Sequence, residues 1–425
     1  MKMRTSHTKR KGFLSEKGAR ITAAATLNQT VVSVPTFQGS STIFAAVEKD
    51  FGWQRATTAG AASAGSLANA MLGPFLGAMT DRIGSARMIL VGLFVAGTGF
   101  ILFSQVRTPW HYYAAWTLVS VGVSIGGFTP SIAAVNMWMS HRRASAMSIV
   151  LAGSSAGAVL VPLMAWSMAG LGWRTTVIGV GITFALIAPA ISWTMRGRPP
   201  DMQTGGNRSA PASDGGISQY DFTPREALRT RAFWTISWSH ALANLSTGVI
   251  SSQVVLHLNA VGLSLTSASL VVPVMGGVAF VFQLVGGQIG DRMGKRVPAS
   301  LFILIQAIAV VVLAFTNGML MAMAFAVLWG IGFGGRTPLL HAMRGDYFGR
   351  KRYATIMSLS AVPMAIGMTV MPWVAGKVFD IQGNYQWVFV GLAVACAAGA
   401  GIILLATPPP ATPQGSSAGL KRADP

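Results

Sequence analysis

The sequence predicts an all-α polytopic membrane protein, with twelve transmembrane helices in two six-helix, pseudo-symmetric halves. Three observations predict this class. Hydrophobic residues make up 52% of the 425 residues and charged residues only 10%, whereas soluble domains carry about 25% charged residues. Long uncharged stretches recur between short charged clusters. Short motifs also repeat at an offset near 210 residues. So few charges could not cover a water-facing surface.

The uncharged stretches are the predicted spans, because about 20 apolar residues cross about 30 Å of hydrocarbon. The spans of the first half are 21–46, 56–79, 87–106, 111–139, 145–170 and 174–195, and those of the second half are 233–260, 266–289, 298–316, 319–343, 353–377 and 386–406. The remaining parts are an extension (1–20), a linker (196–232) and a tail (407–425), which leave bundles at 21–195 and 233–406. The linker is rich in Gly, Ser, Pro and Arg and is expected to be flexible. The Pro- and Ser-rich tail is expected to be disordered.

The excess of positive charge indicates topology. The chain has 32 Lys and Arg against 12 Asp and Glu, a net charge of +20. On a soluble chain this excess would suggest nucleic acid. Here 26 of the basic residues fall on the side of the two termini and 5 on the other. The positive-inside rule therefore predicts that both termini lie in the cytoplasm. We expect a multi-pass protein of a bacterial inner membrane, with lipid around it and no nucleic-acid partner.

Self-comparison indicates a duplication. GAMTDRIGSAR at 77–87 matches GQIGDRMGKR at 287–296, which pairs Asp81 with Asp291. Met147-Ser148 and Met357-Ser358 keep the same offset, and GGFTP at 126–130 matches GGRTP at 334–338. Two similar bundles can rock about a central site and expose it to each side in turn. The repeat therefore favours a transporter.

At these motifs the chain resembles the major facilitator superfamily, whose signature G-x-x-x-D-R-x-G-x-x-R follows the second span. DFGWQRA at 50–56 is similar to the monocarboxylate and oxalate/formate antiporter branch. Asp81 can accept hydrogen bonds from a neighbouring helix N-terminus or from an arginine. The resemblance implies a cluster that latches the cytoplasmic side in the outward-facing state, and simple helix capping is the alternative. The gating candidates are Gly77, Asp81, Arg82, Gly84, Arg87, Arg142, Arg143, Gly287, Asp291, Arg292 and Gly294.

Charges within the spans bear on the substrate. All twelve acids fall in loops, tails or span ends, and Arg336 is the fixed charge inside a predicted span. A charge there is costly and usually faces an interior or aqueous path. A carboxylate of the substrate could neutralise it through a two-pronged hydrogen bond. The alternative is a side chain that snorkels to the interface or caps backbone near Pro338.

Other polar residues within spans are candidates for the cavity. These are Gln38 in the first span, His240 and Asn244 one turn apart in the seventh, and Gln283 in the eighth. The resemblance implies an arginine where this chain has Gln283. His240, His257 and His341 are candidate proton carriers, because neutral pH lies near the reference pKa of imidazole. The alternative for each polar residue is a hydrogen bond between helices.

Missing motifs exclude other functions. The sequence has no G-x-x-x-x-G-K-[ST] motif for an ATP-driven pump. It has no metal-ligand cluster and one cysteine, Cys396, so we expect neither a cofactor nor an enzyme. The leading interpretation is a monomeric secondary transporter of a small organic anion, a carboxylate, together with a coupling ion or counter-substrate. The alternatives are an exporter of amphipathic or drug-like solutes and a non-transporting receptor or assembly partner.

Overall fold

The computed structural model describes residues 16–53, 55–139, 142–197, 199 and 220–410, and these residues form an all-helical protein. Most of the predicted extension, much of the linker and most of the tail lie outside the described residues. The first bundle contains α1 (Glu16–Ser33), η1 (Val34–Gln38), α2 (Ser40–Phe51), α3 (Arg55–Ile83), α4 (Ser85–Phe103), α5 (Pro109–Gly126), α6 (Phe128–Trp138), α7 (Arg143–Ala156), η2 (Gly157–Leu160), α8 (Val161–Leu171) and α9 (Trp173–Thr194). The second contains α12 (Arg231–Ala260), α13 (Leu265–Ser269), α14 (Val271–Met293), α15 (Arg296–Ala314), α16 (Met319–Phe348), α17 (Tyr353–Ser360), α18 (Val362–Gln382) and α19 (Gln386–Leu404), and the short α11 (Pro224–Leu228) precedes it.

Within the described residues, nine helical segments are long and apolar enough to cross a membrane, and the bent helix α12 is a tenth. These ten coincide with ten of the predicted spans. The first two predicted spans correspond to α1–α2 and α3, which are not among the ten. Helix α3 is rich in Ala, Gly, Ser and Thr, small residues of moderate hydropathy that favour close helix packing in membranes.

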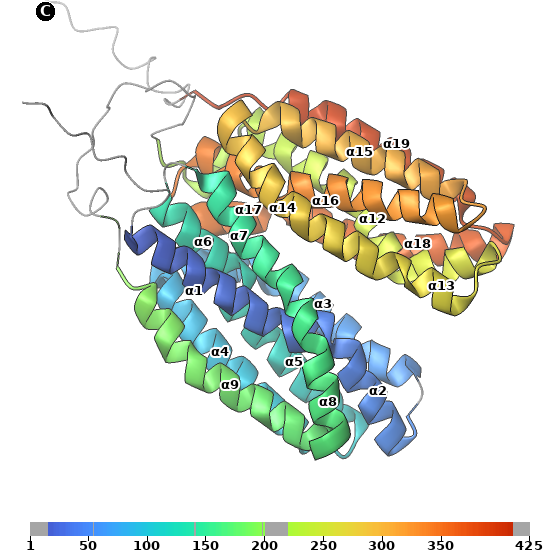
Figure 1. Cartoon of the computed structure of the whole chain (residues 1–425). Helices are drawn as coiled ribbons and strands as arrows, with labels where there is room; N and C mark the ends of the chain where they lie inside the picture. Colours follow the sequence, from blue (N-terminus) through green and yellow to red (C-terminus); the bar gives the residue numbers. More distant parts are fainter. Residues whose placement is uncertain (1–15, 54, 140–141, 198, 200–219, 411–425) are drawn as a thin grey trace, which may run out of the picture.

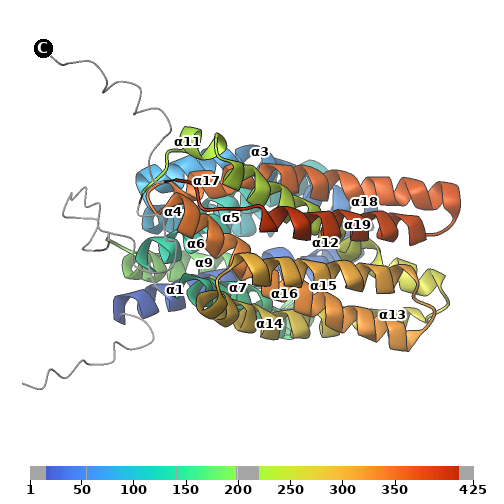
Figure 2. The same cartoon turned by 90° about the horizontal axis from the view of Figure 1, so that it is seen from above.

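The helices form two bundles that approach each other at one end only. Figure 1 shows α1–α9 in blue to green and α12–α19 in yellow to red, with α6, α7 and α17 close together and α2 and α13 far apart. From above, α12, α15, α18 and α19 run side by side (Figure 2). Between the bundles α7 packs on α14 and α3 packs on α17. Helix α17 is the equivalent of α7 in the sequence repeat, and α14 is the equivalent of α3. The two contacts are therefore the same pairing made twice, with the bundles exchanged.

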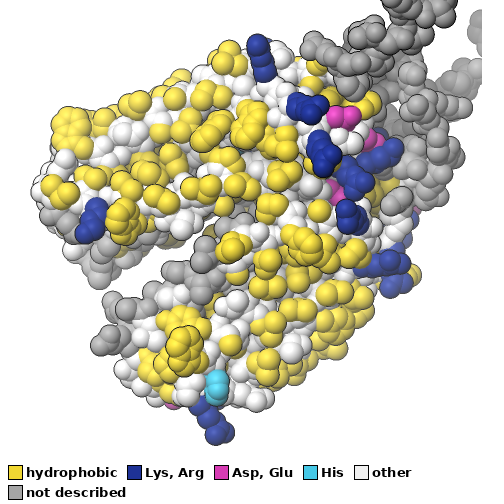
Figure 3. All heavy atoms as spheres, turned by 180° about the vertical axis from the view of Figure 1, so that it is seen from behind, with side chains coloured by type: hydrophobic (Ala, Val, Ile, Leu, Met, Phe, Trp, Pro, Cys, Tyr) yellow, Lys and Arg dark blue, Asp and Glu magenta, His cyan; other side chains and the backbone are white. Residues whose placement is uncertain are grey.

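Surface chemistry separates the flanks from the ends. Large exposed hydrophobic side chains cover the flanks, among them Leu102, Leu186, Trp193, Leu301 and Leu320. Figure 3 shows this hydrophobic surface, with most of the visible Lys and Arg gathered where the bundles meet. We call this the basic end; it holds the α3–α4, α6–α7, α14–α15 and α16–α17 connections. The flanks suit lipid, and the basic end suits water and headgroups.

The described end of the linker is ordered, contrary to the prediction of a flexible linker. Asp221 Oδ1 accepts hydrogen bonds from the backbone N–H groups of Arg350 and Lys351, at 2.6 and 3.1 Å. The backbone N–H of Phe222 donates to Phe348 O at 3.1 Å. A capping box between Thr223 and Glu226 then begins α11. The linker therefore holds the α16–α17 loop at the basic end.

This contact predicts a change in proteolysis. Asp221→Ala leaves two backbone donors of the loop without their carboxylate, a loss of about 1–3 kcal/mol for bonds to a charged group. We expect trypsin to cleave the folded variant after Arg350, Lys351 or Arg352 several-fold faster than wild type, at an unchanged rate elsewhere. Mass spectrometry of limited digests would show this difference. Equal cleavage of the two proteins at this loop would show that Asp221 does not hold it.

Candidate functional site

A cavity of about 310 Å³ lies between the two bundles, where they begin to diverge. Figure 3 shows the gap between the bundles widening away from the basic end. The first bundle contributes polar but uncharged side chains, and the second contributes a guanidinium and two imidazoles. The lining includes Asn69, Ser124, Phe128, Thr129, His240, His341, Arg344, Met357, Ser358 and Met364. The wall is therefore asymmetric in charge.

Arg344 is the cationic residue of this wall. It is buried on α16, and its Nε donates to Ser360 Oγ at 2.8 Å while Nη1 donates to Leu340 O at 3.0 Å. Its Nη2 lies 2.9 Å from His240 Nδ1 on α12. No carboxylate pairs with Arg344 among the described residues. A buried cation without a counter-charge favours an anionic ligand.

His341 lies one turn before Arg344 on α16 and faces both bundles. Its ring meets that of His240 edge-on at 5.5 Å and that of Phe128, from the first bundle, at 5.3 Å. Its backbone carbonyl accepts from the Tyr353 hydroxyl at 3.0 Å. Its Nδ1 is buried without a hydrogen-bond partner among the described atoms. That ring nitrogen is available to a ligand or to water.

Arg336 lies inside the second bundle and is not part of the cavity lining. Its Nε donates to Gln306 Oε1 at 2.6 Å. The Gln306 amide nitrogen in turn donates to Ala243 O and Ser246 Oγ, on α12. The Arg336 Nη1 and Nη2 atoms are buried without a partner in the described structure. The structure therefore places this predicted substrate ligand behind the wall, in a network joining α12, α15 and α16.

The other four candidates for the cavity are dispersed. His240 lines it. Asn244 donates to His240 O within α12, and Gln283 accepts from Ser155 Oγ between α14 and α7. Gln38 lies in η1 of the first bundle and donates to Ser154 O at 3.3 Å. The structure brings together His240 with Arg344 and His341, rather than the five predicted residues.

The predicted gate, meaning the contacts that join the two bundles at the basic end, is built on Asp81. This carboxylate accepts from the backbone N–H groups of Ala354 and Thr355, at 3.1 and 2.8 Å, and from the Thr355 hydroxyl. Of the two expected donors, the helix N-terminus is confirmed, since these residues begin α17. Arg142 and Arg143 are not the observed donors. Burial raises the pKa of Asp81, and the bonds from Thr355 and Ala354 oppose that rise.

Asp291 repeats this arrangement with the halves exchanged. It accepts from the backbone N–H groups of Ala144 and Ser145, at 3.0 and 2.9 Å, at the start of α7. Gly77 and Gly287 let the helix pairs touch, because an added Cβ would lie 2.6 Å from Ala354 O or 2.8 Å from Ala144 O. Gly84 and Gly294 have φ of +95° and +79°, which favours glycine. Two equivalent carboxylate caps therefore join the bundles.

A buried ion-pair cluster also joins the two bundles at the predicted gate. Arg143 Nη1 of the first bundle lies 2.7 Å from Asp346 Oδ1 of the second, and Lys295 Nζ lies 2.6 Å from the other oxygen. Arg143 Nε also donates to Met139 O. The other arginines among the gating candidates, Arg82, Arg87, Arg142 and Arg292, are exposed. Asp346 lies outside the predicted spans, and the sequence pattern does not predict this cluster.

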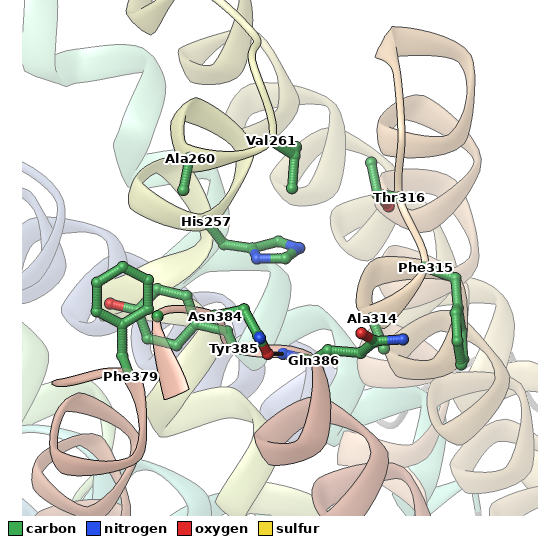
Figure 4. A pocket seen from close by; sticks show the side chains of 11 residues that line it. His257, Ala260, Val261, Ala314, Phe315, Thr316, Phe379, Asn384, Tyr385 and Gln386 are labelled. Atoms are coloured by element: carbon green, nitrogen blue, oxygen red, sulfur yellow. Dashed lines mark hydrogen bonds between the residues drawn. The ribbon is translucent and has the colours of Figure 1, made fainter. Parts of the chain in front are cut away.

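A second cavity lies elsewhere, at the end of the second bundle away from the gate (Figure 4). It measures about 320 Å³ and lies among the ends of α12, α15 and α18. Figure 4 shows His257, Tyr385 and Phe379 in its lining. The His257 ring lies edge-on to that of Tyr385, which stacks on Phe379, and one His257 ring nitrogen lies 3.0 Å from Leu313 O. Its lining contains no Arg, Lys, Asp or Glu. It therefore lacks the charged groups of the central cavity.

The sequence matches the family model described as Major Facilitator Superfamily over residues 26–319 and 236–424. The chain belongs to the major facilitator superfamily. It is accordingly a multi-pass membrane protein and a secondary transporter rather than an enzyme. The resemblance seen in the sequence is confirmed.

Several relatives and solved structures are similar. The Monocarboxylate transporter 13 of Rattus norvegicus is 22% identical over 337 residues, covering 78% of this chain and 75% of that protein. The MFS-type transporter pytF of Aspergillus terreus is 26% identical over 227 residues, covering 52% and 72%. The Fujikurins efflux protein of Gibberella fujikuroi is 32% identical over 94 residues, covering 22% and 20%. The transporter FucP, solved in the outward conformation, has a TM-score of 0.72 at 13% identity and covers 92% of this chain and 99% of its own; it shows the fold alone.

Proposed function

We propose that this transporter carries a small organic anion, a carboxylate, in the cavity between its bundles. The observation that supports this most is Arg344, a buried guanidinium on the cavity wall without a carboxylate partner among the described residues. The His240 and His341 rings line the same wall. A carboxylate would accept from Arg344 in a charge-assisted bond. The monocarboxylate relative supports the same class of substrate.

The transport cycle follows from the gate. The bundles are joined at the basic end by Asp81, Asp291 and Asp346 and diverge at the other. The charge distribution supports placing the basic end in the cytoplasm of a bacterial inner membrane, so this is an outward-facing conformation. Twelve spans, counting α1–α2 and α3, form two pseudo-symmetric halves that alternate access to the cavity. Release requires the three acidic contacts to break.

Ligand-induced stabilisation tests the substrate class. A ligand bound only by the folded protein stabilises it by an amount that grows with its concentration over Kd. We expect lactate, oxalate or benzoate to raise the Tm of the purified wild type, but not that of Arg344→Gln. Choline and glucose should leave both unchanged. Equal stabilisation of the two proteins by the carboxylates would remove Arg344 from the site.

An exporter of amphipathic solutes is the second candidate. The cavity wall contains apolar side chains as well, among them Leu76, Val123, Met357 and Met364, and one segment is similar to the Fujikurins efflux protein. Such a function predicts that neutral or cationic amphiphiles stabilise wild type and Arg344→Gln equally. The same panel of ligands, extended by these amphiphiles, separates the two functions. Because the cavity wall contains a buried cation, Arg344, we favour an anionic substrate over an amphipathic one.

A further inference from the structure

The hydrogen bond between Arg344 and His240 fixes the protonation state of the imidazole. An arginine guanidinium can only donate, so His240 Nδ1, at 2.9 Å from Arg344 Nη2, must accept. The ring in this conformation is therefore neutral and carries its proton on Nε2. A second proton would have to bind at Nδ1, the atom that Arg344 occupies. While Arg344 donates to Nδ1, the imidazolium form of His240 is therefore excluded.

The groups around His240 reinforce this exclusion. From α16 it faces Arg344, His341 and, deeper in the bundle, Arg336. Among the other elements that pack on α12, α17 and α19 carry the buried Tyr353 and Cys396, α15 carries the neutral Gln306, and α18 lines the cavity with Val362, Met364 and Ala365. The cavity wall of the first bundle carries no ionisable side chain among its lining residues. The closest described carboxylate on α16, Asp346, is paired with Arg143 and Lys295. A proton on His240 would therefore join two fixed cations with no anion beside it.

Resting on the proposed function, we propose that binding of the anion at Arg344 is coupled to uptake of one proton by His240 Nδ1. A carboxylate in the cavity accepts the hydrogen bond from Arg344 Nη2 that His240 accepted before. The freed Nδ1 takes a proton from a hydronium ion or a protonated buffer molecule at the open end, whose bond to that proton breaks and whose conjugate base stays in the solvent. One hydrogen bond changes partner and one N–H bond forms, while the carboxylate supplies the missing negative charge. The coupling ion is thus a proton, moving with the anion.

Calorimetry counts the protons directly. Titrating wild-type protein with lactate and with oxalate at pH 8, in two buffers of different ionisation enthalpy, should show uptake of about one proton per anion. By linkage, affinity should fall about tenfold for each pH unit between the pKa of His240 in the free site and its higher pKa in the anion complex. His240→Gln should bind the anion with neither proton uptake nor this pH dependence. His257→Gln, which changes a buried histidine far from the cavity, should behave as wild type.

The outcomes separate the two levels of the hypothesis. Anion binding to wild type without proton uptake overturns the coupling and leaves the anion function standing. Proton uptake that survives in His240→Gln but is lost in His341→Gln overturns the assignment to His240. Absence of binding by both carboxylates overturns the proposed function and the coupling together. The number of protons taken up by wild type is measured without any variant. It therefore tests the coupling of anion binding to proton uptake even if His240→Gln does not fold.

Discussion

Asp346→Asn is expected to open the gate and to lower the stability of the protein more than any other substitution of a charged residue at the basic end. Its carboxylate lies between Arg143 and Lys295, and the Arg143 side chain is only 3% exposed. Removing one partner of a buried ion pair costs about 3–5 kcal/mol, because the remaining charge is left buried and uncompensated. Since Arg143 and Asp346 belong to different bundles, most of that loss falls on the closed conformation. We expect a lower Tm and a population open at the basic end.

Alkylation measures the opening. Ser148 is 1% exposed on α7 and lies against Gly287 of α14. In a Ser148→Cys, Cys396→Ser background, maleimide should react slowly with the closed protein and at least ten times faster with Asp346→Asn.

The pair of Asp50 and Arg174 at the other end supplies the matched control. Its side chains are 40% and 44% exposed, and exposed pairs contribute about 0–1 kcal/mol. Asp50→Asn should therefore leave Tm and alkylation close to those of the parent. Equal effects of Asp50→Asn and Asp346→Asn would show that burial of the gate pair does not set its contribution.

The fold was largely predictable, because a bilayer imposes length and polarity on each span. Ten predicted spans coincide with helical segments that are long and apolar enough to cross a membrane. Asp81 and Asp291 lie at the helix ends that the sequence repeat indicated. The end of the α16 span was less predictable. Placing it at 343 made Arg344 a loop residue, whereas α16 continues to Phe348. A longer helix turns Arg344 into a second buried cation.

The composition of the site could not be read from spacing alone. Arg336 and Arg344 are eight residues apart on one helix, and which of them faces the cavity depends on the packing of α12 and α15. Gln306, on α15, accepts from Arg336, and no pattern in the sequence pairs these residues. Arg344 instead meets His240, which the sequence did indicate. The feature of the sequence that could have identified Arg344 as a site residue is its positive charge, because neither Arg336 nor Arg344 has a described acidic partner.

These two arginines give the second large effect, on transport. Arg344→Gln removes the cation of the cavity wall. A hydrogen bond to a charged group contributes up to about 3 kcal/mol, which corresponds to about 100-fold in affinity. We expect lactate or oxalate uptake into proteoliposomes at subsaturating concentration to fall by about that factor. Arg344→Lys keeps the charge but loses the planar donors, and should retain intermediate activity.

Arg336→Met distinguishes a ligand of the anion from a structural residue. Replacing a buried charge with an apolar side chain of similar length is often neutral or stabilising, and Arg336 lies outside the cavity lining. We therefore expect an unchanged or higher Tm and an anion affinity within about threefold of wild type. If Arg336→Met instead abolished binding while Arg344→Gln retained it, the anion would reach the two buried Nη atoms of Arg336 that have no described partner. The binding site would then lie one helix layer deeper, and the conformation described here would have to rearrange α12 before it could bind its substrate.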